Sequence, residues 1–205
     1  MNPFNKFNKW FNLAKKNFEF DPTAFALSSS SNNKPDVRMV LLKKILPDGY
    51  IFFTNINSNK GKQFNKNNNL AMCFYWESLK KQIRISGRGL IIDDKESDLY
   101  FSSRPRKSQL GAWASKQSSV IKSRKVLINR FQKYEKKFEN NQVTRPPYWI
   151  GIKIVPKTFE FWQGDQFRLH ERELYYLKKK GMAKKNFVAL NFMLHICCLN
   201  FQKLI

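Results

Sequence analysis

Aromatic and other apolar residues recur every three or four positions at the start of the chain, with Asn and Lys between them. This spacing places them on one side of a helix, and Pro3 suits the first turn of such a helix. We therefore predict an opening helix with a structural role, whose apolar stripe consists of Phe4, Phe7, Phe11, Ala14 and Phe18. The polar residues 28–35 that follow predict a loop.

Short runs of β-branched and apolar residues come next, separated by turn-forming residues, which is typical of antiparallel strands. The first four runs are residues 37–45, 50–55, 70–76 and 82–92. The sequence Pro-Asp-Gly predicts a hairpin between the first two runs, and the other two form a second pair. Polar and apolar residues alternate from Gln82 onward, so one face of that strand is polar and is a candidate for lining a site.

The second half of the chain mixes helices and strands. Asp93 is a candidate helix cap, and its helix must end before Arg104-Pro105, because the residue preceding proline avoids the helical region. A longer helix follows Ser118 or Ser119, with an apolar side formed by Val120, Leu127, Phe131, Tyr134 and Phe138. Further strands are expected at residues 149–155, 158–162 and 174–177. Because strands and helices do not alternate regularly, we predict a small antiparallel barrel with three added helices.

The chain has 38 Lys and Arg against 15 Asp and Glu, which gives its 205 residues a formal net charge of +23. Such an excess suits a polyanion partner, so a basic nucleic-acid-binding module is one function hypothesis. However, lysines are spread along the whole chain, and the longest basic run is the three lysines at residues 178–180. The charge therefore favours a solvated, lysine-rich surface, and we expect neither a nucleic-acid partner nor a membrane partner.

Reactive residues are few. Three cysteines, two of them adjacent, predict neither a disulfide framework nor a metal site, and a reducing cytoplasm is the expected compartment. No targeting segment is recognisable, and no apolar run reaches the roughly 20 residues of a membrane span. With two histidines and no H-E-x-x-H or G-x-S-x-G motif, hydrolysis by zinc or by a serine nucleophile is disfavoured. No G-x-G-x-x-G motif occurs either, so a nucleotide-type cofactor would need another phosphate-binding device.

Several short clusters instead combine cations with hydroxyl, amide and aromatic residues, which suits the binding of planar, phosphorylated small molecules. The runs RMVLLK, FFTN, SRPRKSQLGAWASKQSS and FEFWQGDQFRLHER lie in one register within about residues 3–177. With these runs the chain closely resembles the pyridoxine/pyridoxamine 5'-phosphate oxidase family, flavin enzymes that make pyridoxal 5'-phosphate. The resemblance implies a mainly β, Greek-key split barrel with added helices. It also implies a homodimer with FMN at the subunit interface.

The resemblance further implies roles for individual residues. The FMN-binding residues would be Arg38, Met39, Val40, Leu41, Leu42, Lys43, Phe53, Thr54, Lys60, Gln82, Gln117, Ser118, Trp162 and Arg172, partly from the other subunit. The substrate-binding residues would be Lys43, Tyr100, Arg104, Ser108, Arg168, Leu169 and His170, with Arg168 and His170 as the catalytic pair. Each residue considered alone also has a structural interpretation. Lys60 would then be a surface lysine, Trp162 a core aromatic and Ser118 a helix cap.

The implied reaction is oxidation of pyridoxine 5'-phosphate or pyridoxamine 5'-phosphate by O₂, with hydrogen peroxide as the second product. In that reaction a hydride leaves the C4' carbon of the substrate for the flavin. The flavin supplies the redox chemistry, so the protein needs only to stack the two rings, orient the reacting carbon and stabilise charge.

The chain departs from the family pattern within the expected FMN site and in its C-terminal part. Asn59 stands where an arginine usually precedes Lys60, which removes a cation from the expected FMN phosphate site, and Phe53 stands where tyrosine is common. After about Leu177 the resemblance fades, so we separate a barrel domain, residues 1–180, from a divergent tail, residues 181–205. The tail is either a product of a shifted reading frame or a divergent terminal helix. These changes favour a second hypothesis, a split barrel that binds flavin or pyridoxal phosphate without turnover.

Overall fold

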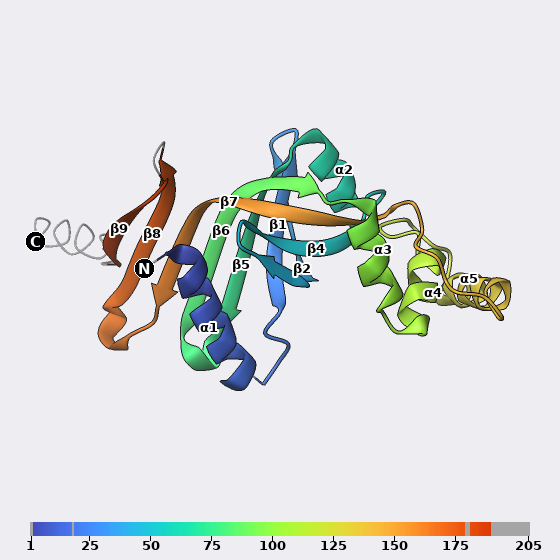
Figure 1. Cartoon of the computed structure of the whole chain (residues 1–205), viewed down its shortest axis with the longest axis horizontal. Helices are drawn as coiled ribbons and strands as arrows, with labels where there is room; N and C mark the ends of the chain where they lie inside the picture. The colour runs from blue at the N-terminus through green and yellow to red at the C-terminus, as the bar shows by residue number, and fades with distance from the viewer. Residues whose placement is uncertain (1, 18, 179–180, 190–205) are drawn as a thin grey trace, which may run out of the picture. The chain divides into compact units, whose positions relative to one another are not determined.

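The computed structural model describes residues 2–17, 19–178 and 181–189 and divides them into two compact units. Unit 2 takes residues 23–72 and 86–156, and unit 1 takes the others. Three long strands, β5 (Asn69–Trp76), β6 (Lys81–Ile91) and β7 (Trp149–Gln163), contribute to both units (Figure 1). The hydrogen-bonded strand order is β2-β1-β5-β6-β7-β4-β3, with β8 paired to β7 and β9 paired to β8.

Unit 2 combines short antiparallel strands with helices. Its strands include β1 (Ala24–Ser31), β2 (Lys34–Leu41), β3 (Lys44–Leu46) and β4 (Gly49–Asn55). Its helices include α2 (Asn59–Lys66), α3 (Asp94–Ser102), α4 (Arg106–Ala114) and α5 (Arg124–Lys137). Leu27 of β1 lies opposite Arg38 of β2, and Phe53 of β4 lies opposite Gly151 of β7. This register brings the end of β4 beside the start of β7.

Unit 1 contains α1 (Pro3–Asn17), β8 (His170–Lys178) and β9 (Gly181–Ala189), with single turns η1 (Glu77–Leu79) and η2 (Gln166–Arg168). The apolar stripe of α1 packs on the sheet: the Phe7 and Phe11 rings lie 5.4 and 6.4 Å from the ring of Phe74, centroid to centroid. Burying a side chain of this size stabilises the fold by roughly 1.5–3 kcal/mol. The predicted opening helix and its structural role are therefore confirmed.

Other predictions for single elements are also confirmed. The two strands β5 and β6 are neighbours in the sheet, as expected for the second pair. Asp93 caps α3, where its carboxylate accepts a hydrogen bond of 2.7 Å from the Lys95 N–H, and α3 ends before Arg104. Along β6, buried and exposed residues alternate from Ile83 to Gly89, so its polar positions face outward.

The predicted loop at residues 28–35 is wrong. Residues 28–31 complete β1, and β2 begins at Lys34, with Asn32 and Asn33 forming the turn in left-handed conformations. The run of serines predicted a loop because serine side chains form hydrogen bonds with nearby backbone groups and so compete with the ladder of a strand. Here the buried Ser29 hydroxyl donates to the Gln63 side chain at 2.6 Å, which satisfies it inside a strand.

Several element boundaries and partners also differ from the prediction. Residues 37–41 belong to β2 and pair with β1, and only β3 forms the expected hairpin with β4. The long helix begins at Arg124, after Ser123, so Val120 lies outside it and is fully exposed. Residues 149–163 form one strand, β7, in place of two. The short polar helix α2 and the helix α4 within the SRPRKSQLGAW run were not predicted.

Residues 181–189 continue the sheet. Residues 181–189 form β9, which pairs antiparallel with β8 so that Tyr175 lies opposite Lys184. The prediction of a terminal helix is therefore wrong for residues 181–189. Residues 190–205, the rest of the predicted tail, lie outside the described residues, and the shifted reading frame stays a prediction.

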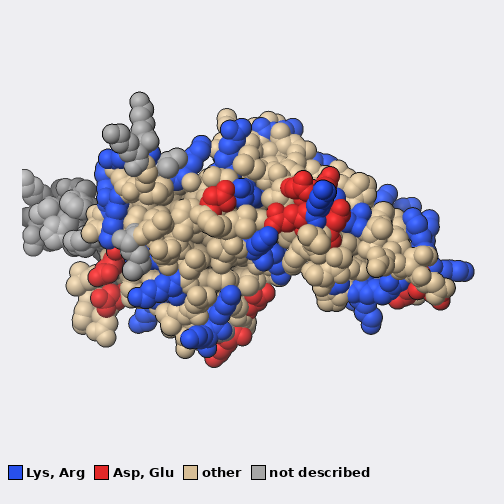
Figure 2. Space-filling view, viewed as in Figure 1, with Lys and Arg blue, Asp and Glu red and all other residues tan. Residues whose placement is uncertain are grey.

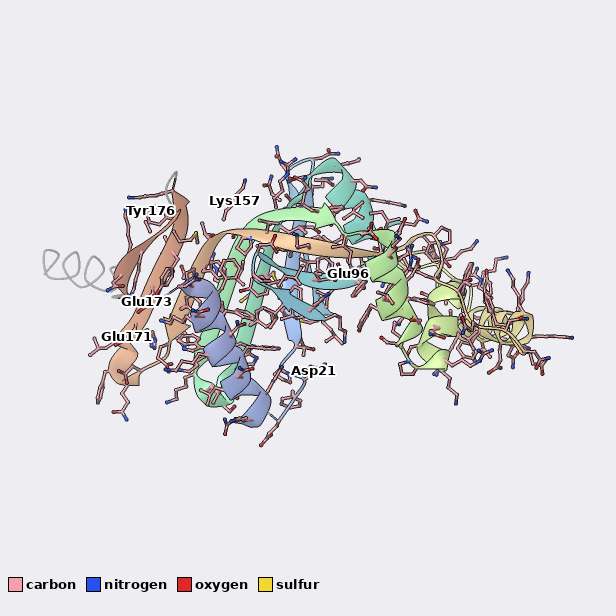
Figure 3. The ribbon with its side chains drawn as sticks, in the orientation of Figure 1. Asp21, Glu96, Lys157, Glu171, Glu173 and Tyr176 are labelled. Carbon is pink, nitrogen blue, oxygen red and sulfur yellow. The ribbon has the colours of Figure 1, made fainter. Side chains whose placement is uncertain are left out.

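Glu173 lies on β8 (labelled in Figure 3). It joins α1 and β9 by ion pairs to Lys6 and Lys184, the latter at 2.8 Å. Its partial burial by itself raises its pKa, but hydrogen bonds from Lys184, Lys6 and Tyr175 lower that pKa to about 2. A lowered pKa stabilises the fold above the ordinary glutamate pKa near 4.3, and this stabilisation is lost as pH falls toward 2.

We therefore expect Glu173→Gln to lower the free energy of unfolding by about 1–2 kcal/mol at pH 7, after allowance for solvent screening. The difference from the unsubstituted protein should shrink below pH 4.5, and denaturant melts across pH 2–8 measure it. Glu171→Gln, on the same strand at an exposed position, is the matched control and should change stability by less than about 0.5 kcal/mol. Equal losses for both variants, or a pH-independent loss for Glu173→Gln, would contradict the assignment.

Lys and Arg side chains are scattered over the visible face of the molecule without gathering into one block (Figure 2). This distribution agrees with the interpretation of the charge as a solvated, lysine-rich surface. Among the described residues, no helix has the length and apolar character that crossing a membrane requires.

Candidate active site

A cavity of about 400 Å³ lies in unit 2. It is formed by β2 and the residues that follow it, the end of β4, the start of α2, the segments around α3 and α4, and the start of β7. The lining residues are Arg38, Met39, Val40, Leu41, Lys43, Phe53, Thr54, Asn55, Lys60, Tyr100, Arg104, Ala112, Ser115, Gln117 and Trp149. Four of these side chains are cations and none is acidic, so the cavity suits an anionic ligand.

Arg38 is held from several sides at one end of the cavity. Its Nη1 donates to the Ser29 hydroxyl at 2.6 Å and to the Leu27 carbonyl at 3.2 Å, while Nη2 pairs with Asp36 and Gln63. These contacts fix the guanidinium, and the Asp36 carboxylate offsets part of its charge. Arg38 therefore serves as a fixed part of the cavity wall.

Lys60 lies in the first turn of α2, and the partial positive charge at a helix N-terminus favours anions. Its Nζ lies 3.2 Å from Gln117 Oε1 and 3.3 Å from Ser58 Oγ, and the Asn59 N–H donates to the Ser118 hydroxyl at 3.3 Å. Burial lowers the pKa of Lys60, the Arg38 charge lowers it further, and Asp36 opposes both. Two cations, Arg38 and Lys60, and the hydroxyls of Ser58 and Ser118 thus meet near the N-terminus of α2 at one end of the cavity, a set of groups suited to a phosphate.

Three aromatic rings stack along another wall. The Phe53 ring lies 4.2 Å from the Tyr100 ring and 4.7 Å from the Trp149 ring, with interplanar angles of 9° and 6°. The Arg104 guanidinium carbon lies 5.0 Å from the centroid of Trp149. Two buried polar atoms, Thr54 Oγ1 and Arg104 Nη1, have no hydrogen-bond partner among the described residues. Buried polar atoms are nearly always hydrogen-bonded, so these two indicate a ligand.

The structure brings together at this cavity most of the unit 2 residues that were predicted to bind the cofactor or the substrate. The predicted residues that line it are Arg38, Met39, Val40, Leu41, Lys43, Phe53, Thr54, Lys60, Tyr100, Arg104 and Gln117. Ser118 touches the start of α2 but is exposed, Ser108 is exposed on α4, and Leu42 is buried in the core.

The other predicted site residues lie in unit 1 and are not among those that line the cavity. The Trp162 and His170 rings lie 4.8 Å apart, and His170 Nδ1 accepts a hydrogen bond of 3.1 Å from the Asp165 N–H. Arg172 pairs with Glu160 at 2.6 Å, while Gln82 is half-buried and Leu169 exposed. The side chain of Arg168 lies outside the described part of the chain.

The site residues assigned from the sequence left out four residues that line the cavity, namely Asn55, Ala112, Ser115 and Trp149. Asn55, Ala112 and Ser115 lie within the runs FFTN and SRPRKSQLGAWASKQSS that carried the resemblance, so assigning a role to every residue of those runs finds them. Trp149 had no such signal, because only the pairing of β4 with β7 brings its ring to Phe53.

Two stretches of the chain match known family sequence patterns. Residues 13–138 match the family described as Pyridoxamine 5'-phosphate oxidase, and residues 149–187 match the Pyridoxine 5'-phosphate oxidase C-terminal dimerisation region. The chain belongs to the pyridoxamine 5'-phosphate oxidase family. The second match reaches into β9, beyond the point where the motif resemblance to this oxidase family fades.

Relatives in the pyridoxamine 5'-phosphate oxidase family cover most of the chain. A protein of Nostoc sp. PCC 7120 named pyridoxine/pyridoxamine 5'-phosphate oxidase is 46% identical over 86% of this chain and 83% of its own length. A protein of Pelagibacter ubique with the same name is 44% identical over 92% of both chains. Both identities confirm the family resemblance.

Solved structures also resemble the chain. PhzG of Burkholderia lata, solved with tetrahydrophenazine-1-carboxylic acid, superimposes with a TM-score of 0.86 at 24% identity, covering 91% of this chain and 92% of its own. A pyridoxamine 5'-phosphate oxidase-related, FMN-binding protein of Nostoc punctiforme gives 0.71 at 15% identity, covering 91% and 98%. These likenesses concern the fold, and they confirm the predicted mainly β split barrel with added helices.

Proposed function

We propose that the protein is an FMN-dependent oxidase that converts pyridoxine 5'-phosphate or pyridoxamine 5'-phosphate to pyridoxal 5'-phosphate, with O₂ reduced to hydrogen peroxide. The observation that carries the proposal is the cavity of unit 2. It combines four cations, an aromatic wall and two buried polar atoms without partners among the described residues. Relatives that share 44–46% identity with the chain bear the name of this oxidase.

The residues at one end of the cavity fit FMN. Lys60, Gln117 and the N–H groups at the start of α2 would hold its phosphate, while β2 from Arg38 to Leu41 would lie along its ring. Thr54 Oγ1, buried and without a partner in the described chain, would bond to the ring edge. When bound, the flavin accepts the hydride from the substrate and passes the electrons to O₂.

The substrate phosphate fits the opposite side of the same cavity. We assign it to Arg104, Tyr100 and Lys43, with Ser108 nearby on α4. Burial lowers the pKa of Arg104, and the guanidinium stays charged because its ordinary pKa is above 12. A desolvated cation of this kind forms a stronger bond to phosphate than an exposed lysine does.

We further propose a homodimer with FMN at the subunit interface. Residues 149–187 match a dimerisation region, and along β2 the side chains of Val37 and Met39 are 63% and 64% exposed. An apolar strand face of this kind beside the cavity suits a second copy of the chain. In this assignment Gln82, Trp162 and Arg172 contact FMN, partly from the partner subunit, while Arg168, Leu169 and His170 contact the substrate.

The visible spectrum and oxygen uptake test the proposed function together. We expect purified protein supplied with FMN to show a flavin absorption band and to consume O₂ when pyridoxamine 5'-phosphate is added. A flavin band without oxygen uptake would instead support the non-catalytic split barrel. Retention on a polyanion that falls steeply with salt, without a flavin band, would support the nucleic-acid-binding module.

Asn59 offers a prediction at the FMN phosphate site. We expect Asn59→Arg to bind FMN about fivefold more tightly, because it adds an exposed cation beside the assigned phosphate position, and an exposed charge contact contributes about 1 kcal/mol. Titrating apo-protein with FMN by flavin fluorescence measures the affinity. Asn65→Arg, near the other end of α2, adds the same net charge and should change affinity less than twofold. Equal affinities for Asn59→Arg and the unsubstituted protein would refute the prediction.

A further inference from the structure

Arg104 has aromatic neighbours where a carboxylate would be usual. It lies in the three-residue link between α3 and α4, and its guanidinium carbon lies 5.0 Å from the Trp149 ring and 5.4 Å from the Phe101 ring. In the described part of the chain, no acidic side chain forms an ion pair with it, and its buried Nη1 has no hydrogen-bond partner. The ring faces attract the cation without neutralising it.

The Trp149 ring is itself fixed. It stacks on Phe53 at 4.7 Å and meets the edge of Phe101 at 5.1 Å with an interplanar angle of 72°. Only 8% of the residue is exposed. Packing on two sides therefore leaves the ring one orientation.

The backbone of Trp149 is anchored to α3 as well. Its carbonyl accepts a hydrogen bond of 2.7 Å from Arg145 Nη1, and the same guanidinium pairs with Asp94 at 2.7 Å and with Asp98. Arg145 is only 10% exposed. Since α3 carries Tyr100 and leads into Arg104, this anchor ties the ring and the cation to the same helix.

We propose that Trp149 is a positioning residue that holds the Arg104 guanidinium at the cavity wall with its charge free for the phosphate of the substrate. The inference rests on the proposed function and adds a residue that the family motifs did not indicate. A carboxylate in place of the ring would fix Arg104 equally well but would compete with the phosphate. Without the ring, the long arginine side chain has more rotamers to lose when the phosphate binds.

If Trp149 positions Arg104, replacing Trp149 should weaken the binding only of substrates that carry a phosphate. With Trp149→Leu we expect the KM for pyridoxamine 5'-phosphate to rise about tenfold, with kcat changed less than threefold. The kcat/KM for pyridoxamine, which lacks the phosphate, should stay within twofold. Trp149→Phe, which keeps a ring for the cation, should restore most of the lost affinity.

Trp113→Leu is the matched control. Trp113 is partly buried against the apolar cluster that contains Trp149, and its ring contacts Lys137, but it does not line the cavity. It should leave the KM within twofold, and thermal melts of both variants separate the phosphate effect from a loss of folded protein. Equal KM increases for Trp149→Leu and Trp113→Leu, or an equal loss with pyridoxamine, would overturn the positioning role.

A double-mutant cycle and a binding measurement complete the test. In an Arg104→Leu background, Trp149→Leu should add less than a twofold loss, whereas an additive tenfold loss would overturn the coupling. Calorimetric titration of the FMN-loaded protein with inorganic phosphate should show about tenfold weaker binding to Trp149→Leu, and unchanged binding would overturn the proposal. Because this titration needs no turnover, an inactive protein that still shows this loss would contradict the oxidase function alone.

Discussion

Arg104→Leu should lower kcat/KM for pyridoxamine 5'-phosphate by roughly 100-fold, equivalent to about 2.7 kcal/mol. The half-buried guanidinium has an unpaired Nη1 at the cavity wall, and no ion pair with an acidic side chain ties it up in the described chain. Its removal leaves the substrate phosphate in a partly desolvated place without its main counter-charge. Steady-state oxygen uptake over a range of substrate concentrations measures the effect.

The matched variant Arg104→Lys keeps the charge but loses the planar fork and the stacking on Trp149, so we expect an intermediate loss of about tenfold. FMN affinity should stay within twofold in both variants, because we assign the FMN phosphate to Lys60 and the start of α2. If Arg104→Leu instead weakened FMN binding and left the KM unchanged, the two phosphate assignments would have to be exchanged.

Gly61→Ala should destabilise the protein by about 2–3 kcal/mol and weaken FMN binding at least tenfold. Gly61 lies in the first turn of α2, and a Cβ there would meet the backbone of Ile56, 2.1 Å from its carbonyl oxygen and 2.5 Å from its carbonyl carbon. A backbone atom cannot swing aside as a side chain does, so the start of α2 must shift. That shift displaces Lys60 and the Asn59 N–H together.

Gly111→Ala provides the contrast. Gly111 lies inside α4, and a Cβ there meets no described atom within 4 Å. Because glycine costs about 1 kcal/mol relative to alanine within a helix, this variant should be more stable by up to that amount. Denaturant melts and FMN titrations of the two variants give the comparison. A Gly61→Ala protein with unchanged stability and FMN affinity would show that α2 does not need this close approach.

Local patterns predicted the elements whose signal lies within a single stretch of chain. The stripe of α1 is such a case, since Phe7 and Phe11 recur at helical spacing and are both buried. The helix α2 is different: only Gly61 and Phe64 of its eight residues are buried, so no apolar stripe marks it. The strand β1 was missed because its buried Ser29 depends on Gln63 and Arg38, which are distant in sequence.

The candidate site also contains residues that the sequence predicted and residues that it did not. Residues within contiguous motifs, such as Arg38 to Leu41 and Phe53-Thr54, were predicted by number and line the cavity. Trp149 was not, because its role depends on the register of β4 and β7 and on a cation contributed by the α3–α4 link. The order of residues in a motif gives their chemical types, whereas contacts between distant segments depend on tertiary packing.

The exposed side of β2 relates dimerisation of the chain to its melting temperature. Val37 and Met39 are apolar and largely exposed in the single chain, and among the described strands only β1 is hydrogen-bonded to β2. If a second copy covers this strand, subunit separation and unfolding become one mass-action equilibrium. The melting temperature then rises with protein concentration, and dilution alone favours both dissociation and the exposure of an aggregation-prone edge.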